Sequence, residues 1–124
     1  MLLQIDERQM DPGITVLTLS GKLALGRESQ RIESMVDDLT GKGTKRVIFD
    51  MAAVDYIDSA GIGLIALASG KVKQAGGKMA LVAPEGTRVR QLLALTQVNA
   101  IVSVCDTLDQ AAASFAQTQP PASA

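Results

Sequence analysis

The sequence predicts a single α/β domain built on a mainly parallel sheet of four or five strands, with about four helices. The chain has 124 residues, which is the size of one domain. Hydrophobic residues make up 47% and charged residues 20%, a balance typical of a folded domain and not of a disordered chain. Short apolar runs alternate with amphipathic segments, and this alternation favours parallel strands joined by helices.

The N-terminal part is expected to form a hairpin. Residues 14–20 read I-T-V-L-T-L-S, an alternating run rich in β-branched residues that predicts a strand. Leu2–Arg8 is a possible edge strand before it, and Asp11-Pro12-Gly13 between the two is a turn signal. After the second strand, residues 21–23 are expected to leave the sheet.

Strand–helix units are expected to fill the rest of the chain. The predicted helices are Arg27–Leu39, Ser59–Ala75, Thr87–Thr96 and Thr107–Ala116, and the predicted strands between them are Arg46–Asp50, Lys78–Ala83 and Ile101–Cys105. We expect Met51–Asp58 to be a short loop, part of which can extend the sheet. We expect the domain to span residues 1–116, and residues 117–124, with their Pro-Pro pair, to form a flexible C-terminal tail.

Composition excludes several classes of function. The chain has no histidine and one cysteine, Cys105, so it cannot form a histidine-dependent triad, an internal disulfide or a cysteine zinc site. A net charge of −1 and few aromatic residues argue against nucleic-acid binding. No signal-peptide or membrane-spanning pattern is evident, and the single cysteine cannot form an internal disulfide, so we expect a cytoplasmic protein. We also expect no cofactor, no metal site and no enzymatic activity. Arg88 and Arg90 are expected on a solvated helix face.

The junction between strand 46–50 and the helix that begins at residue 59 is open to several interpretations. A serine nucleophile elbow would need a glycine two residues before the serine, and a histidine to activate it. A dinucleotide-binding turn is matched by Gly61, Gly63 and Ala66, but the chain has too few strands for two mononucleotide-binding halves. Binding of a small molecule or nucleotide therefore stays a minor alternative.

A purely structural interpretation of the junction is a helix cap. Either Asp58 or Ser59 can cap the helix, and glycines allow a helix to pack closely on a sheet. Gly61 and Gly63 nevertheless each cost helix stability, about 1 kcal/mol relative to alanine. Some feature of the structure or of a partner should therefore require their bare backbone.

A fourth interpretation is a phosphorylation switch at Ser59. A phosphate in the first helical turn is favoured by free N–H groups and by the helix dipole, so it would not melt the helix. Beside Asp55 and Asp58, the added negative charge would repel a partner that docks on Ile62 and on the neighbouring glycine backbone. Such a modification would control a binding face and leave the fold intact.

The hexapeptide at residues 58–63, D-S-A-G-I-G, resembles a hallmark of the STAS domain of bacterial anti-sigma factor antagonists. The resemblance covers roughly Leu2–Ala116, including the preceding strand 47–50 and the segment 73–78. It implies a regulator of transcription whose serine at position 59 is phosphorylated by a serine kinase that is itself the anti-sigma factor. The unphosphorylated form would bind this kinase and release a sigma factor, and a metal-dependent serine phosphatase of the PP2C type would reset the switch.

By the same resemblance, residues around Ser59 would form the docking face. The expected partner-binding residues are Asp58, Gly61, Ile62, Gly63, Gly21 and Ala24. Ala60 stands where the family often has serine or threonine, and Ala24 where it commonly has aspartate. These two departures leave an alternative to the phosphorylated antagonist: the protein would be an accessory STAS subunit of a lipid-transporting ABC complex, or a signalling scaffold. We expect the free protein to be a monomer that binds no nucleic acid and does not insert into a membrane.

Overall fold

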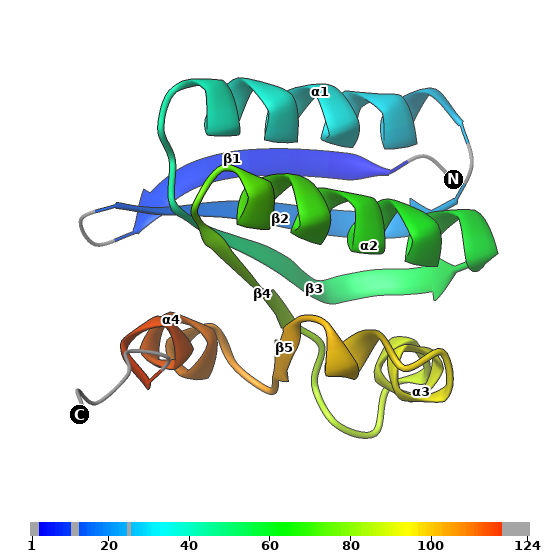
Figure 1. The fold of residues 1–124 in the computed structure, drawn as a ribbon. Coiled ribbons are helices and arrows are strands. Elements are labelled where there is room, and N and C mark those ends of the chain that lie inside the picture. Colours follow the sequence, from blue (N-terminus) through cyan, green and yellow to red (C-terminus); the bar gives the residue numbers. More distant parts are fainter. Residues whose placement is uncertain (1–2, 11–12, 25, 118–124) are drawn as a thin grey trace.

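The computed structural model describes residues 3–10, 13–24 and 26–117, and shows a five-stranded mixed sheet with four α-helices (Figure 1). The elements in chain order are β1 (Gln4–Met10), β2 (Ile14–Leu23), α1 (Arg27–Gly41), β3 (Arg46–Ile57), α2 (Ser59–Gln74), β4 (Lys78–Val82), α3 (Arg88–Leu95), a 3₁₀ turn η1 (Val98–Ala100), β5 (Ser103–Cys105) and α4 (Leu108–Gln117). The predicted α/β class, the strand number and the helix number are confirmed.

The strands lie in the sheet in their chain order, β1-β2-β3-β4-β5. β1 and β2 pair antiparallel, as the predicted hairpin requires, and every later pair is parallel. Figure 1 shows α1 and α2 side by side on one face of the sheet, with α4 on the opposite face. α1 connects β2 to β3, and α2 connects β3 to β4 and packs on both of those strands.

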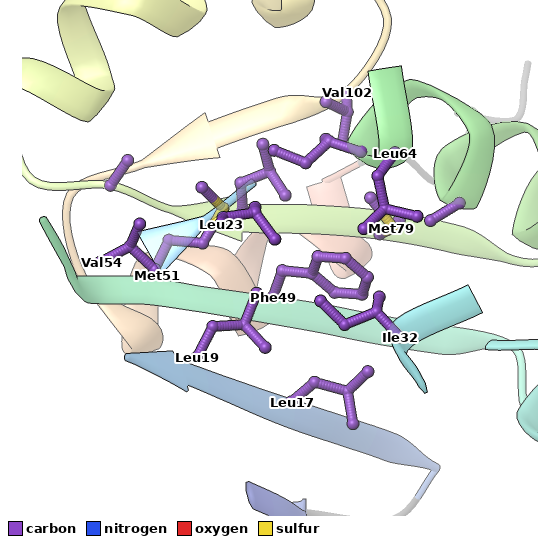
Figure 2. Close-up of a cluster of buried hydrophobic side chains, with 14 of the residues drawn as sticks. Leu17, Leu19, Leu23, Ile32, Phe49, Met51, Val54, Leu64, Met79 and Val102 are labelled. Atoms are coloured by element: carbon purple, nitrogen blue, oxygen red, sulfur yellow. The ribbon is translucent and has the colours of Figure 1, made fainter. Parts of the chain in front are cut away.

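The core follows the two-residue period of the strands, which sends neighbouring side chains to opposite faces. On β3, Val47 and Phe49 pack into the larger cluster under α1 and α2, whereas Ile48 joins the cluster under α4. Phe49 is completely buried, and Figure 2 shows it beside Ile32 of α1 and Leu17 of β2. With so few aromatic residues, aliphatic side chains fill most of both clusters.

The prediction that residues 21–23 leave the sheet is wrong. β2 continues to Leu23, and β3 continues through most of the expected loop to Ile57, so that Leu23 pairs with Ile57. The register shifts twice along this extension, and Gly21 adopts a positive φ of 98° beside the second shift. Because of these irregularities, the buried residues of the extension are spaced by three (Met51, Val54, Ile57) and not by two.

The last predicted strand begins later than expected. Val98–Ala100 form the 3₁₀ turn η1, and β5 starts at Ser103 instead of Ile101, which is exposed. α4 begins at Leu108, and the Thr107 hydroxyl accepts a hydrogen bond from the Gln110 N–H at 3.1 Å, as expected of a capping residue. Of the predicted tail, residues 118–124 lie outside the described residues.

Arg90 connects α3 to the segments that follow β4 and β5. Its Nη1 donates to the Ala83 carbonyl at 2.8 Å and to Asp106 Oδ1 at 2.9 Å, and the same Asp106 oxygen accepts from the Glu85 N–H at 2.9 Å. The expectation of a solvated arginine is therefore wrong for Arg90 and holds for Arg88, which is exposed. Next to this network, burial raises the pKa of the Cys105 thiol.

Replacing Arg90 with alanine is expected to lower the free energy of unfolding by about 1–2 kcal/mol, because it leaves the Ala83 carbonyl and Asp106 without this donor. Arg88→Ala, two residues earlier on the exposed side of the same helix, should change it by less than about 0.5 kcal/mol. Urea denaturation of the two variants beside the wild type measures the difference. Equal stabilities of the two variants would contradict the structural role of Arg90.

Candidate functional site

The residues singled out by the sequence gather where β2 and β3 end and α2 begins. Because β2 and β3 run parallel, their carboxyl ends lie at the same edge of the sheet. The pairing of Leu23 with Ile57 continues into a hydrogen bond from the Asp58 N–H to the Leu23 carbonyl, at 3.4 Å. This pairing brings residues 21–24 next to residues 58–63, as the resemblance implied.

Asp58 is the N-cap of α2. Its backbone is extended, and its Oδ1 accepts a hydrogen bond from the Gly61 N–H at 2.9 Å. Its carbonyl accepts from the Ile62 N–H at 3.0 Å, which closes the first turn of the helix. The capping interpretation is therefore confirmed for Asp58. Ser59 is the first residue of the helix, and its side chain is exposed.

Gly61 and Gly63 have different structural environments. Gly61 is buried, and a Cβ atom placed on it would lie 2.3 Å from the Leu23 carbonyl oxygen and 2.9 Å from Ile57 Cγ1. Only glycine allows the first turn of α2 to approach β2 so closely. Gly63 is exposed, with no atom within 4 Å of such a Cβ, so packing does not explain it.

The other predicted docking residues lie at the same edge with differing exposure. Ile62 is partly buried against the larger core cluster. Gly21 supplies the positive φ at the irregularity of β2, and Ala24 follows β2 with a partly buried side chain. Gly21 and Gly61 thus have backbone roles in the fold, whereas Gly63 offers exposed surface next to Ser59.

Sequence reasoning missed three exposed residues that border Ser59 along α2 and at the ends of the strands. Leu67 is 46% exposed and lies two turns after Ser59 on the same helix face, with Gly63 between them. Tyr56, at the end of β3, is 49% exposed, and the Lys22 ammonium lies 5.8 Å from the centroid of its ring. The pairing of Lys22 with Tyr56 could be found only if β2 was known to continue past Gly21.

The charges around Ser59 are mixed. Asp55 is exposed near the end of β3 and the Asp58 carboxylate is partly buried in its capping bond, while Lys22 lies across the strand pair from Tyr56. Over residues 3–10, 13–24 and 26–117, no three His, Cys, Asp or Glu side chains are grouped as a metal site requires. What the arrangement offers chemically is a single exposed hydroxyl at a helix N-terminus, beside partly apolar surface.

The two glycines should respond in opposite ways to alanine. Gly61→Ala is expected to lower the free energy of unfolding by about 2 kcal/mol or more, because the new methyl group clashes with backbone that cannot retreat. Gly63→Ala should raise it by about 0.5–1 kcal/mol, because alanine is the better helix former and has room. Thermal or urea denaturation measures both, and stabilisation by Gly61→Ala would contradict the close contact with Leu23.

Comparison with known proteins places the chain in a family. The model of the STAS domain matches residues 7–111. A Bordetella bronchiseptica protein provisionally named as the anti-sigma factor antagonist BtrV is 26% identical over 108 residues, which are 87% of this chain and 91% of that protein. A Thermotoga neapolitana protein, also provisionally named an anti-sigma factor antagonist, is 33% identical over 75 residues, which are 60% of this chain and 66% of the relative.

Solved structures agree with this assignment. The crystal structure of a Thermotoga maritima protein, provisionally titled an anti-sigma factor antagonist, superposes with a TM-score of 0.78 at 25% identity, and the match covers 89% of this chain and 92% of that one. The anti-sigma factor antagonist SpoIIAA, in its unphosphorylated form, shares the fold with a TM-score of 0.71 at 15% identity, over 94% and 100% of the two chains. The match of the STAS domain model to residues 7–111, which are most of the chain, shows that this chain belongs to the STAS domain family.

Proposed function

We propose that this protein is an anti-sigma factor antagonist whose binding face is switched by phosphorylation of Ser59. The observation that carries the proposal is the placement of Ser59 as the exposed first residue of α2, directly after a cap that Asp58 alone provides. The names of the relatives support the same function, and one solved form of the structurally similar SpoIIAA is phosphorylated.

The unphosphorylated protein would bind through the exposed surface around Ser59. Tyr56, Ile62 and Leu67 supply partly exposed apolar side chains, and Gly63 lets a partner approach the helix backbone between them. The names of the relatives suggest an anti-sigma factor as the partner, and binding it would free a sigma factor for RNA polymerase. By the resemblance, this anti-sigma factor is a serine kinase.

Phosphorylation of Ser59 would reverse binding through charge. A phosphoserine carries about −1.5 to −2 charges at neutral pH, added next to the carboxylates of Asp55 and Asp58. The helix would persist, because the phosphate sits at the positive end of the helix dipole and the capping bonds belong to Asp58. Removal of the phosphate by a PP2C-type phosphatase would restore the docking face.

The first test is phosphorylation itself. We expect incubation with lysate of the source organism and Mg-ATP to add one phosphate to the wild type and none to Ser59→Ala, as measured by intact mass. Ser34→Ala, which removes an exposed hydroxyl on α1, should still gain one phosphate. If kinases of the lysate are shown to be active and no phosphate is gained, the switch is excluded and the accessory-subunit alternative gains support.

The second test concerns binding. Ser59→Asp is expected to weaken binding of the anti-sigma partner by about tenfold or more, because a carboxylate beside Asp58 repels a surface that fits the neutral serine. Ser34→Asp adds the same charge on α1 and should bind as the wild type does. Titration calorimetry with the purified partner measures both, and equal affinity of Ser59→Asp and wild type would overturn the charge mechanism.

Leu67 tests the extent of the docking face. Leu67→Ser is expected to weaken partner binding about fivefold, because covering the exposed half of a leucine side chain is worth roughly 1 kcal/mol. Leu95→Ser removes an even more exposed leucine at the end of α3 and serves as the matched control. Both variants should stay folded, although Leu67→Ser should lower the unfolding free energy by about 1 kcal/mol, because it also removes the buried half of the side chain. Equal losses in the two variants would show that the face does not extend along α2.

A further inference from the structure

A pocket of about 250 Å³ lies at the β5 edge of the sheet, beside the half of α2 that is farther from Ser59. It exists because β5 is short: its pairing with β4 begins at Ala80, so no strand of the described chain pairs with Lys78 and Met79 on that side. Its walls come from α2, β4, the segment before β5, and α4. The lining includes Ser69, Lys73, Lys78, Met79, Val102 and Phe115.

Ser69 is the unusual residue of this pocket. It is only 8% exposed, and its hydroxyl forms no hydrogen bond within the described part of the chain. By contrast, the partly buried Ser114 on α4 donates to the Ala111 carbonyl of the preceding turn at 2.6 Å. A buried polar group without a partner is rare in folded proteins, since its desolvation is not compensated. The Ser69 hydroxyl is therefore available to a ligand in the pocket.

Two cations line the same pocket. Lys73 follows Ser69 by one helical turn on the same face of α2, and Lys78 begins β4. Neither ammonium forms an ion pair with any of the residues that the structure describes, in contrast to Lys71, which lies 2.7 Å from Asp37. No acidic side chain lines the pocket among these residues. The polar side of the pocket thus offers hydrogen-bond donors and positive charge.

Part of the pocket lining is apolar and comes from both faces of the sheet. Met79 and Val102 belong to the core cluster under α1 and α2, Phe115 belongs to the cluster under α4, and all three are nearly completely buried. A ligand that fits must combine one anionic group with a compact apolar body. At about 250 Å³ the pocket is smaller than a typical site for a drug-sized molecule, which excludes a whole nucleotide from being enclosed.

We propose that this pocket binds a small organic monocarboxylate, with the carboxylate at Ser69, Lys73 and Lys78 and the aliphatic part against Met79, Val102 and Phe115. The site is separate from the docking face. Ser59 and Ser69 are ten residues apart on one helix, which corresponds to about 15 Å. The proposal does not depend on the function assigned to Ser59.

Octanoate is a suitable probe, titrated into the ¹⁵N-labelled full-length protein and followed by NMR. We expect saturable shifts of the backbone amides of Met79 and Val102, with the amide of Ser59 unmoved. Octanol lacks the charge and should bind at least about tenfold more weakly, a difference of 1.4 kcal/mol. The double variant Lys73→Gln/Lys78→Gln should bind octanoate about tenfold more weakly than the wild type, whereas the surface control Lys42→Gln should bind octanoate as the wild type does.

Ser69→Ala separates the hydroxyl from the charges. It should weaken octanoate binding severalfold. The fold should stay intact, because the hydroxyl that is removed forms no hydrogen bond within the described part of the chain. Several results would overturn the proposal: no saturation by octanoate, equal affinity for octanol, or unchanged affinity of the double lysine variant. Shifts at Met79 and Val102 that depend on protein concentration without octanoate would assign the pocket to a contact between copies of the chain, which also overturns it.

Discussion

The approach of α2 to the end of β2 is the contact on which the site depends. The Leu23 carbonyl accepts the Asp58 N–H, and the same oxygen lies so close to Gly61 that no side chain fits there. This contact requires that β2 and β3 stay paired to their last residues. It fixes where α2 begins, and the start of α2 in turn decides which residue is the cap and which is the exposed first residue.

The consequence is a separation between stability and signalling at one helix end. The Asp58 carboxylate accepts the Gly61 N–H, so the capping hydrogen bond of α2 is made without the Ser59 hydroxyl. Ser59 can therefore change its chemistry without removing a bond that holds the fold. A serine that was itself the cap would lose its capping bond on modification, and a change of binding would then be mixed with a change of stability.

Local sequence patterns predicted most of the fold. They predicted the less regular half of the site poorly. The hairpin, the buried strand 46–50 and the apolar helix after it follow from two-residue and helical periods. The extension of β3 was expected only as a possible continuation after a loop, because at each of its two register shifts with β2 the strand β3 contains one extra residue, and its buried residues are then spaced by three. The partner of Arg90, 16 residues away, and the exposure of Leu67 likewise depend on how separate elements meet, which no local pattern records.

Close backbone contacts fix the position of α2 near both of its ends, one beside the docking face and the other beside the pocket. At the far end, a Cβ on Gly77 would lie 2.6 Å from the Lys45 carbonyl oxygen, and that oxygen accepts the Lys78 N–H at 2.7 Å. Between the ends, Lys71 binds Asp37 of α1. Two sites influence each other only where an element between them has two arrangements of similar free energy. A helix fixed by close backbone contacts at both ends cannot slide along the sheet, so occupancy of the pocket should leave the position of Ser59 unchanged.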